Sequence, residues 1–254
     1  MESSLQNFAI AAGLFLVLMA CAEIGFRRGK HRSQSPDAKA AGQIGTVIGA
    51  LLGLLGLLLG FSFAAAGARF IERQDLIVTE ANAIGTASLR ADLLDEPHRS
   101  ELRSALKAYT AHRIEVSARA ASSLTAQDEA DVARLQDQIW KTGMAGVAAK
   151  PHVMLGVLPP LNDVIDLHTT RVWAARKHIP MLVSGLLMAC SMLSVGVLGY
   201  SMGLGGTRSA PLILSVAALI AATLWITYDL DHPRGGLLQL NDAPLKALKF
   251  DAGP

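Results

Sequence analysis

The chain has 254 residues, of which 51% are hydrophobic and 17% are charged, and its mean hydropathy is +0.36. This composition is too apolar for an average soluble domain and is typical of a membrane protein. The formal net charge of +2 indicates no nucleic-acid partner. The two cysteines, Cys21 and Cys190, both lie in apolar runs, so neither a disulfide framework nor a zinc site is expected.

Four apolar runs are long enough to cross a hydrocarbon core of about 30 Å. They cover residues 7–26, 43–66, 179–203 and 210–228. The first run is expected to stay uncleaved, because no basic residue precedes it and Arg27 and Arg28 follow it. No alternating strand pattern occurs in the sequence. We therefore predict an all-α fold with four transmembrane helices, the second of them extended beyond the bilayer.

The second span carries its glycines on one face and continues without a proline from Ala41 to Asp92. This pattern predicts one helix of about 50 residues, roughly 75 Å long. Seven glycines fall within an arc of about 80° on a helical wheel. In lipid, small residues let two backbones approach closely, so the stripe predicts a helix-packing seam that includes Gly45, Gly49, Gly53, Gly56 and Gly60. Ordinary glycine scatter is the alternative, and the partner helix could belong to the same chain or to another subunit.

Beyond the bilayer, the apolar residues of this helix keep the phase of the glycines, and we expect a single buried face. That face would include Ile71, Ile77, Val78, Ala81, Ile84 and Leu89. Most of the charged residues between Arg69 and Arg90 occupy the opposite half of the wheel.

Residues 67–178 are predicted to form an extramembrane helical region. One helix is expected from Asp95, as N-cap, to about Ala121, followed by a break at residues 122–125. Thr125 and Asp128 resemble a capping arrangement for a helix that reaches about Lys141. We expect a loop or short turns over residues 143–160, a helix over 161–178, and a C-terminal tail over 229–254 that opens with a turn.

The orientation in the membrane follows from loop charge. Residues 27–40 form a short basic loop, which the positive-inside rule places in the cytoplasm. The 67–178 region would then face the exterior. Basic residues flank the other side as well, so the two arrangements are nearly balanced.

Three motifs resemble the bestrophin-like family of bacterial four-span membrane proteins, over nearly the whole chain. They are the basic loop after the first span, the segment 72–85 with 93–99 after it, and Asp229-Leu230-Asp231-His232-Pro233 after the fourth span. Family members usually have phenylalanine after that proline, where this chain has Arg234. The resemblance implies a multi-pass protein of the bacterial inner membrane. It also implies a distant likeness to bestrophins, pentameric anion channels whose pore is lined by span two and whose large domain is cytoplasmic.

This likeness makes span two and its extension the candidate polar or pore lining. The candidates are Phe61, Phe63, Glu72, Arg73, Glu80, Asn82 and Arg90. For the charged residues, the alternative is a solvated helix face with intrahelical ion pairs. Asn82 could also be a buried hydrogen-bonding residue between helices.

Asp229 and Asp231 form an acidic motif at the membrane edge, with His232 beside them. Carboxylates suit a hard cation, but two from one short segment do not make a site, and we expect capping and turn formation instead. No metal or cofactor is predicted. The sequence contains no GxSxG motif, P-loop or paired cysteines, so no enzymatic activity is expected.

Two functions remain. The first is a homo-oligomeric ion channel with span two near the central axis, and anions are the ions that the resemblance implies. The second is a non-conducting sensor or scaffold, anchored in the lipid bilayer, whose 67–178 region binds a protein partner.

Overall fold

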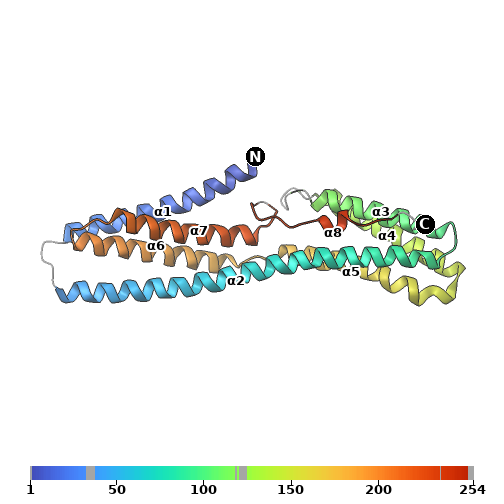
Figure 1. Cartoon of the computed structure of the whole chain (residues 1–254), viewed down its shortest axis with the longest axis horizontal. Helices are drawn as coiled ribbons and strands as arrows, with labels where there is room; N and C mark the ends of the chain where they lie inside the picture. Colours follow the sequence, from blue (N-terminus) through green and yellow to red (C-terminus); the bar gives the residue numbers. More distant parts are fainter. Residues whose placement is uncertain (1, 33–37, 118, 120–124, 235, 251–254) are drawn as a thin grey trace. The chain divides into compact units, whose positions relative to one another are not determined.

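The computed structural model describes residues 2–32, 38–117, 119, 125–234 and 236–250, and all regular structure in them is helical (Figure 1). The helices are α1 (Glu2–Arg32), α2 (Ala38–Arg90), η1 (Ala91–Leu93), α3 (His98–Ser117), α4 (Ala126–Ala149), η3 (Pro151–Val153), α5 (Met154–Arg176), α6 (Met181–Leu204), α7 (Ala210–Asp231) and α8 (Ala243–Lys246). Four helical stretches are long and apolar enough to cross a membrane. The predicted all-α, four-span fold is confirmed.

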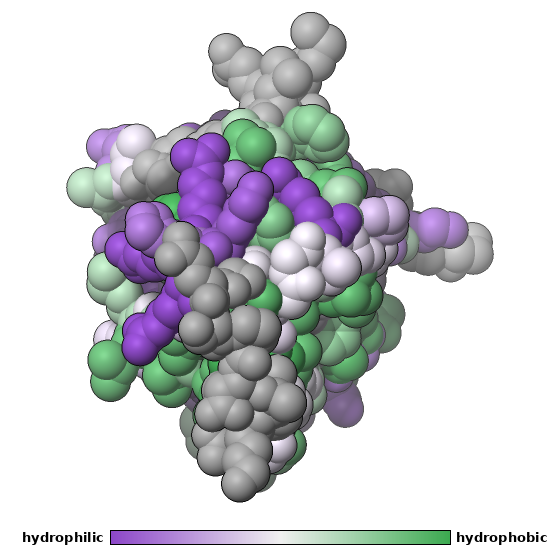
Figure 2. All heavy atoms as spheres, turned by 90° about the vertical axis from the view of Figure 1, so that its left-hand side faces the viewer, coloured by the Kyte–Doolittle hydropathy of each residue, from purple (hydrophilic) through white to green (hydrophobic). Residues whose placement is uncertain are grey.

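The chain forms two compact units. The membrane unit consists of Met1–Arg69 and His178–Leu238, and the second unit consists of Phe70–Lys177 and Gln239–Pro254. The membrane unit contains α1, the first part of α2, α6 and α7. Figure 2 looks onto one end of this unit. Hydrophilic side chains gather on the face toward the viewer, and hydrophobic side chains lie along the sides. This distribution fits the multi-pass membrane protein that the apolar helices indicate.

Helix α2 is a single helix of 53 residues, roughly 80 Å long. It continues through Gly67, so the predicted unbroken helix is confirmed. Its residues up to Arg69 belong to the membrane unit, and those from Phe70 belong to the second unit.

The closest helix contact in the membrane unit joins α1 to α6. A Cβ atom built at Gly199 or Gly203 of α6 would overlap the carbonyl oxygen of Ala22 or Phe26 on α1. A Cβ atom at Gly25 of α1 would in turn overlap the carbonyl oxygen of Gly196. Only glycine permits this approach, which brings many backbone atoms into dispersion contact. This glycine contact differs from the seam predicted on the second span and was not predicted from the sequence.

Apolar side chains complete the interior of the membrane unit. They are Leu18 and Ala22 of α1, Leu55 and Leu59 of α2, Leu187 and Val195 of α6, and Ile213, Ala217, Ile220 and Ala221 of α7. Helix α2 therefore joins the other spans through larger side chains and not through its glycines.

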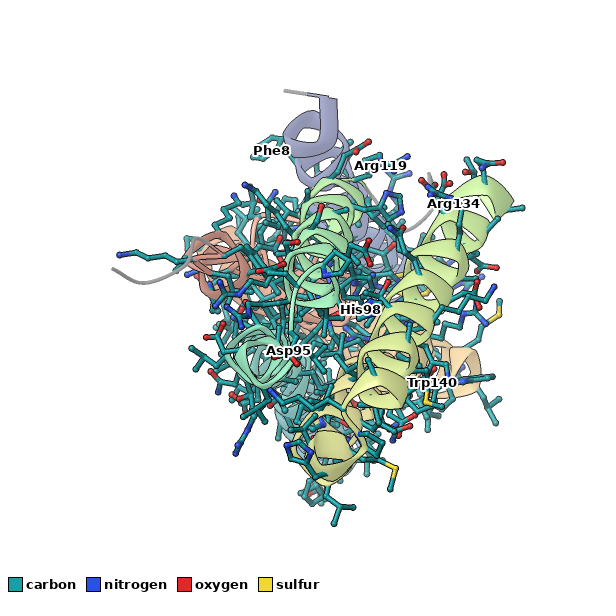
Figure 3. The ribbon with its side chains drawn as sticks, turned by 90° about the vertical axis from the view of Figure 1, so that its right-hand side faces the viewer. Phe8, Asp95, His98, Arg119, Arg134 and Trp140 are labelled. Carbon is teal, nitrogen blue, oxygen red and sulfur yellow. The ribbon has the colours of Figure 1, made fainter. Side chains whose placement is uncertain are left out.

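The core of the second unit lies between the continuation of α2, η1, and helices α3, α4, α5 and α8. Ile77, Ile84, Leu106, Ile139 and Leu161 are completely buried in it. Figure 3 shows α3 and α4 of this unit, with His98 at the start of α3 and Trp140 on α4. The capping box predicted for Thr125 and Asp128 is confirmed, because each side chain accepts a hydrogen bond from the other residue's backbone N–H.

Some helix bounds differ from the prediction. Helix α3 begins at His98, three residues after the expected N-cap, and the carboxylate of Asp95 instead pairs with Lys150 Nζ at 3.0 Å. It ends at Ser117, short of the predicted Ala121, which lies with the predicted break at 122–124 outside the described residues.

The prediction of a loop or short turns over residues 143–160 is wrong for most of this segment, and only residues 150–153 form a short turn. Helix α4 continues to Ala149, and α5 begins at Met154 and contains Pro159 and Pro160. Position 143 of α4 requires glycine, because Leu161 of α5 occupies the space that a larger side chain would need. Close packing thus offsets the low helix propensity of Gly143, which is a turn signal by sequence alone.

We predict that Gly199→Ala lowers the stability of the membrane unit by about 1–3 kcal/mol, because the new methyl group must push α1 and α6 apart. The measurement is thermal unfolding of the purified protein in detergent. The matched control is Gly185→Ala on the same helix, where a Cβ atom meets nothing within 4 Å. The control should match or slightly exceed the wild type, and an equal loss in both variants would contradict the prediction.

Candidate functional site

The glycine face of α2 is open in the single chain. A Cβ atom built at Gly45, Gly49, Gly53, Gly56 or Gly60 meets no atom within 4 Å. These five glycines are exposed. Gly42, the first of the seven, lies outside the residues whose surroundings the structure describes. Within the described part of the chain, the predicted seam therefore has no partner helix, in contrast to the glycines that join α1 to α6.

The buried face of α2 lies beside the glycine face. Leu55, Leu59, Ala66, Ile77 and Ile84 are buried, and on a helical wheel they centre on a direction about 100° from the glycines. Ile77, Ala81 and Ile84 are buried as expected, but the glycines are exposed, so the expectation of one buried face in phase with the glycines holds only in part within the single chain.

Three apolar residues that continue the glycine face are exposed. Ile71 retains 60%, Val78 40% and Leu89 71% of their accessible surface. These residues lie in the second unit, so this part of α2 has exposed apolar side chains of its own.

The two aromatic candidates also point outward. Phe61 and Phe63 are both exposed. Residues two apart on a helix do not share a face, so the two rings cannot line the same surface of α2.

Glu80 lies at the centre of a buried polar network. Its side chain is completely buried. Atom Oε1 accepts hydrogen bonds from the Tyr109 hydroxyl at 2.9 Å and from Arg113 Nε at 3.1 Å. Atom Oε2 pairs with Arg171 Nη1. The network joins α2, α3 and α5, so Glu80 is not part of a solvated helix face, which was the alternative interpretation of the charged candidates.

Charged and polar neighbours surround Glu80. Arg113 and Arg171 each carry a positive charge and pair with Glu80. The negative charge of Asp242 also stabilises the charged form of Arg113. Burial lowers the pKa of Arg113 and raises the pKa of Tyr109. The carboxylate of Glu80 thus pairs directly with both guanidinium groups, and such pairing is the condition for burying these charges.

His168 borders the same network. Burial, followed by the charges of Arg113 and His112, lowers its pKa from 6.5 to about 4. Its Nδ1 atom is buried without a hydrogen-bond partner. His168 is therefore neutral at neutral pH.

Arg73 is buried and caps the end of α5. Its Nε donates to the carbonyl oxygen of Ala174 at 3.1 Å, and its Nη2 donates to that of Lys177. A guanidinium group at this position satisfies carbonyl groups that the helix leaves unpaired and complements the helix dipole.

The other candidates on α2 are exposed. Glu72 forms a 3.6 Å ion pair with Lys177, and both side chains face solvent. Asn82 and Arg90 are exposed as well. The interpretation of Asn82 as a buried hydrogen-bonding residue is therefore not supported, and its role in a lining stays a prediction.

Asp229 holds a turn in the tail. Its carboxylate accepts hydrogen bonds from the backbone N–H groups of Leu237 at 3.0 Å and Leu238 at 2.8 Å. A Cβ atom at Gly236 would overlap this carboxylate, so the turn requires glycine there. This contact agrees with the capping and turn formation expected from the sequence.

Asp231 faces different neighbours. Its carboxylate accepts from the Ile179 backbone N–H at 3.0 Å and from Arg69 Nε at 3.3 Å, and it lies 3.2 Å from His178 Nδ1. The imidazole rings of His178 and His232 stack with centroids 4.6 Å apart. Asp231 thus connects the end of α7 with α2 and with the start of α6.

The partners of these carboxylates were not predicted from the sequence. Tyr109 and Arg113 lie on the buried face of α3 together with Leu102, Leu106 and Val116. An arginine in such an apolar stripe was the available signal, because an arginine is almost never buried without a partner. No local signal identified Arg171, Arg69 or His178.

We predict that Glu80→Gln destabilises the second unit by about 3–5 kcal/mol, because two buried guanidinium groups lose their carboxylate. The measurement is thermal unfolding followed by circular dichroism. The control, Glu72→Gln, removes an exposed pair and should cost about 0–1 kcal/mol. Replacing Arg171 by methionine in the Glu80→Gln background should restore part of the loss; equal effects of the two single variants would refute the role of Glu80.

We predict that protonation of His168 destabilises the second unit in acid. A histidine with a lowered folded-state pKa contributes stability that is complete above 6.5 and is lost as the pH falls toward about 4. The loss is on the order of 3 kcal/mol. His168→Gln should remove this component, so the variant should lose less stability than the wild type between these pH values. Parallel curves for the two proteins would contradict it.

Comparison with known proteins places the chain in a family. A family model of the bestrophin-like domain matches residues 12–245. Among solved structures, the chain is similar to a point mutant of a bacterial bestrophin homologue from Klebsiella pneumoniae, with 16% identity and a TM-score of 0.58. The match covers 96% of this chain and 92% of that chain, and it supports the fold. Comparison with curated proteins gives no match. Because the family model spans most of its length, the chain belongs to the bestrophin-like family.

Proposed function

We propose that the chain forms a homo-oligomeric ion channel of the bacterial inner membrane, with α2 of each copy near the central axis. The observation that carries the proposal is the open face of α2. That face consists of glycines in the membrane unit and of exposed Ile71, Val78 and Leu89 in the second unit.

Lipid alone does not account for this face. Acyl chains can cover the glycines, but the second unit is rich in charged residues and its α2 segment is expected to lie in water. Each fully buried isoleucine, valine or leucine side chain contributes about 1.5–3 kcal/mol. A second copy of the chain would cover these three side chains, and its close approach at the glycines would gain packing contacts in the bilayer.

Conduction requires an oligomer, because four spans of one chain are too few to enclose an aqueous path. Helix α2 is the span with an open glycine face for the axis, whereas Gly25 and Gly29 of α1 and Gly199 and Gly203 of α6 lie in the contact between those two helices. The span from Ile44 to Ala68 contains no charged residue. The distant likeness to bestrophins supports the choice of anions and of α2 as the lining.

A second candidate is a non-conducting scaffold or sensor. It is favoured by exposed apolar side chains on the second unit, which we propose form one binding surface: Trp140 and Met144 of α4, and Met154 and Leu155 of α5. Figure 3 labels Trp140 on α4. A soluble partner protein would bind this surface.

We predict that purified wild-type protein is oligomeric in detergent and carries chloride flux in liposomes, and that Gly53→Leu loses both. The new side chain meets no atom of its own chain, and leucine has the better helix propensity. The monomer should therefore fold, while the contact between copies of α2 is blocked. Size-exclusion chromatography with light scattering and a liposome flux assay measure the two properties.

Gly185→Leu is the control, because Gly185 is also exposed in a span and has open space around it. It should keep the oligomer and the flux. An oligomer without conductance under varied pH, voltage and ions would refute the channel. Capture of a partner that Trp140→Ser abolishes would then favour the scaffold, and a monomeric wild type would refute the shared axis.

A further inference from the structure

Two histidines and one aspartate meet at the end of the membrane unit where α7 finishes and α6 begins. His178 precedes α6, Asp231 is the last residue of α7, and His232 is the C-cap of that helix. One nitrogen of each imidazole and one carboxylate oxygen of Asp231 all lie within 4.8 Å of one another. Residues separated by 53 positions in the chain thus converge on one carboxylate.

The carboxylate of Asp231 is held in place before any ligand arrives. It is buried, and its two oxygens have different neighbours. Atom Oδ1 accepts from Arg69 Nε, whereas Oδ2 accepts from the Ile179 N–H and faces both histidines, at 3.2 Å from His178 Nδ1 and 4.0 Å from His232 Nδ1. Arg69 can therefore remain paired while Oδ2 binds a cation.

The two imidazoles are accessible from solvent. The side chain of His178 is 42% exposed and that of His232 is 41% exposed. They form a parallel stack, with an angle of 11° between the ring planes, and the Tyr228 ring stacks on His232 from 4.3 Å. An ion can thus reach the cluster, and the half-exposed rings have room to turn.

The ligand types select the class of metal. Two imidazole nitrogens and one carboxylate oxygen suit Zn²⁺ and its neighbours Co²⁺ and Ni²⁺, whereas Ca²⁺ and Mg²⁺ prefer a set of oxygens. At metal–ligand distances of about 2.0–2.1 Å, the ligands of a tetrahedral site lie about 3.4 Å apart. The ligand atoms must therefore approach one another slightly, and the rings must leave their parallel stack so that both lone pairs point to the ion.

We propose that His178, Asp231 and His232 form a binding site for a divalent transition metal of the Zn²⁺ class. Turning the rings exchanges the contacts of His178 Nδ1 with the Asp231 carbonyl oxygen and of His232 Nδ1 with the Tyr228 carbonyl oxygen for the metal. Water would complete the coordination. The metal would fix the segment before α6 to the end of α7, beside the pair of Asp231 and Arg69. The site is independent of ion conduction.

The test titrates the full-length protein in detergent with ZnCl₂ by isothermal titration calorimetry. We expect one Zn²⁺ per chain, an affinity at least tenfold weaker in His178→Ala and in His232→Ala, and no binding in the double variant. CaCl₂ and MgCl₂ should give no comparable heat. His152→Ala is the matched control, because His152 is exposed and lies outside the cluster, and it should bind as the wild type does.

Wild-type protein loaded with Co²⁺ gives a second readout that does not depend on the folding of the variants. Visible absorption bands of four-coordinate Co²⁺ with nitrogen ligands would support the site. A wild-type spectrum equal to that of hydrated Co²⁺, Zn²⁺ binding retained by the double variant, an equal loss in His152→Ala, or stronger binding of Ca²⁺ than of Zn²⁺ would each overturn it.

Discussion

The contact between α1 and α6 determines how the other spans are arranged in the membrane unit. Gly25, Gly199 and Gly203 bring the two backbones so close that a methyl group at any of them would overlap a carbonyl oxygen. Helix α7 fills the remaining side of this pair with Ile213 and Ala217. These glycines of α1 and α6 are thus used within the chain, and those of α2 are left on its outside. In the single chain, α2 joins the other spans through leucines.

The network around Glu80 has a different role in the second unit. A buried ion pair is weak evidence for stability, because desolvation offsets much of the attraction between the charges. Its geometry is more informative. Glu80 of α2 meets Arg113 of α3 and Arg171 of α5, and a shift of any of these helices by one residue would leave a buried charge unpaired. We infer that the network selects one register among packings that the apolar side chains alone would tolerate.

The sequence predicted the features whose causes are local. The length of α2 follows from its periodicity and the absence of proline, and the capping box at Thr125 follows from two side chains three residues apart. The α4–α5 junction was mispredicted because glycine and proline are turn signals by propensity, whereas Leu161 packs against Gly143 in the folded chain.

The candidate site was harder to predict because its partners are distant in sequence. Glu80 was identified as a candidate, but Arg113 and Arg171 lie 33 and 91 residues away from it. The single sequence contains no signal for such pairings beyond an arginine in the apolar stripe of α3. The glycine stripe was visible, but whether its partner belongs to the same chain depends on which glycines the other helices use.

The segment from Asp229 to His232 shows that the side chains of one short motif can point in different directions and serve different roles. Two aspartates two residues apart resemble a pair of ligands for one hard cation. On a helix such residues do not face each other, and here Asp229 binds the backbone of the tail while Asp231 faces Arg69 and His178. One carboxylate is therefore fully used by a turn. The other acquires imidazole neighbours, one of them from a distant segment, and these nitrogens shift the preferred ion from the calcium class to the zinc class.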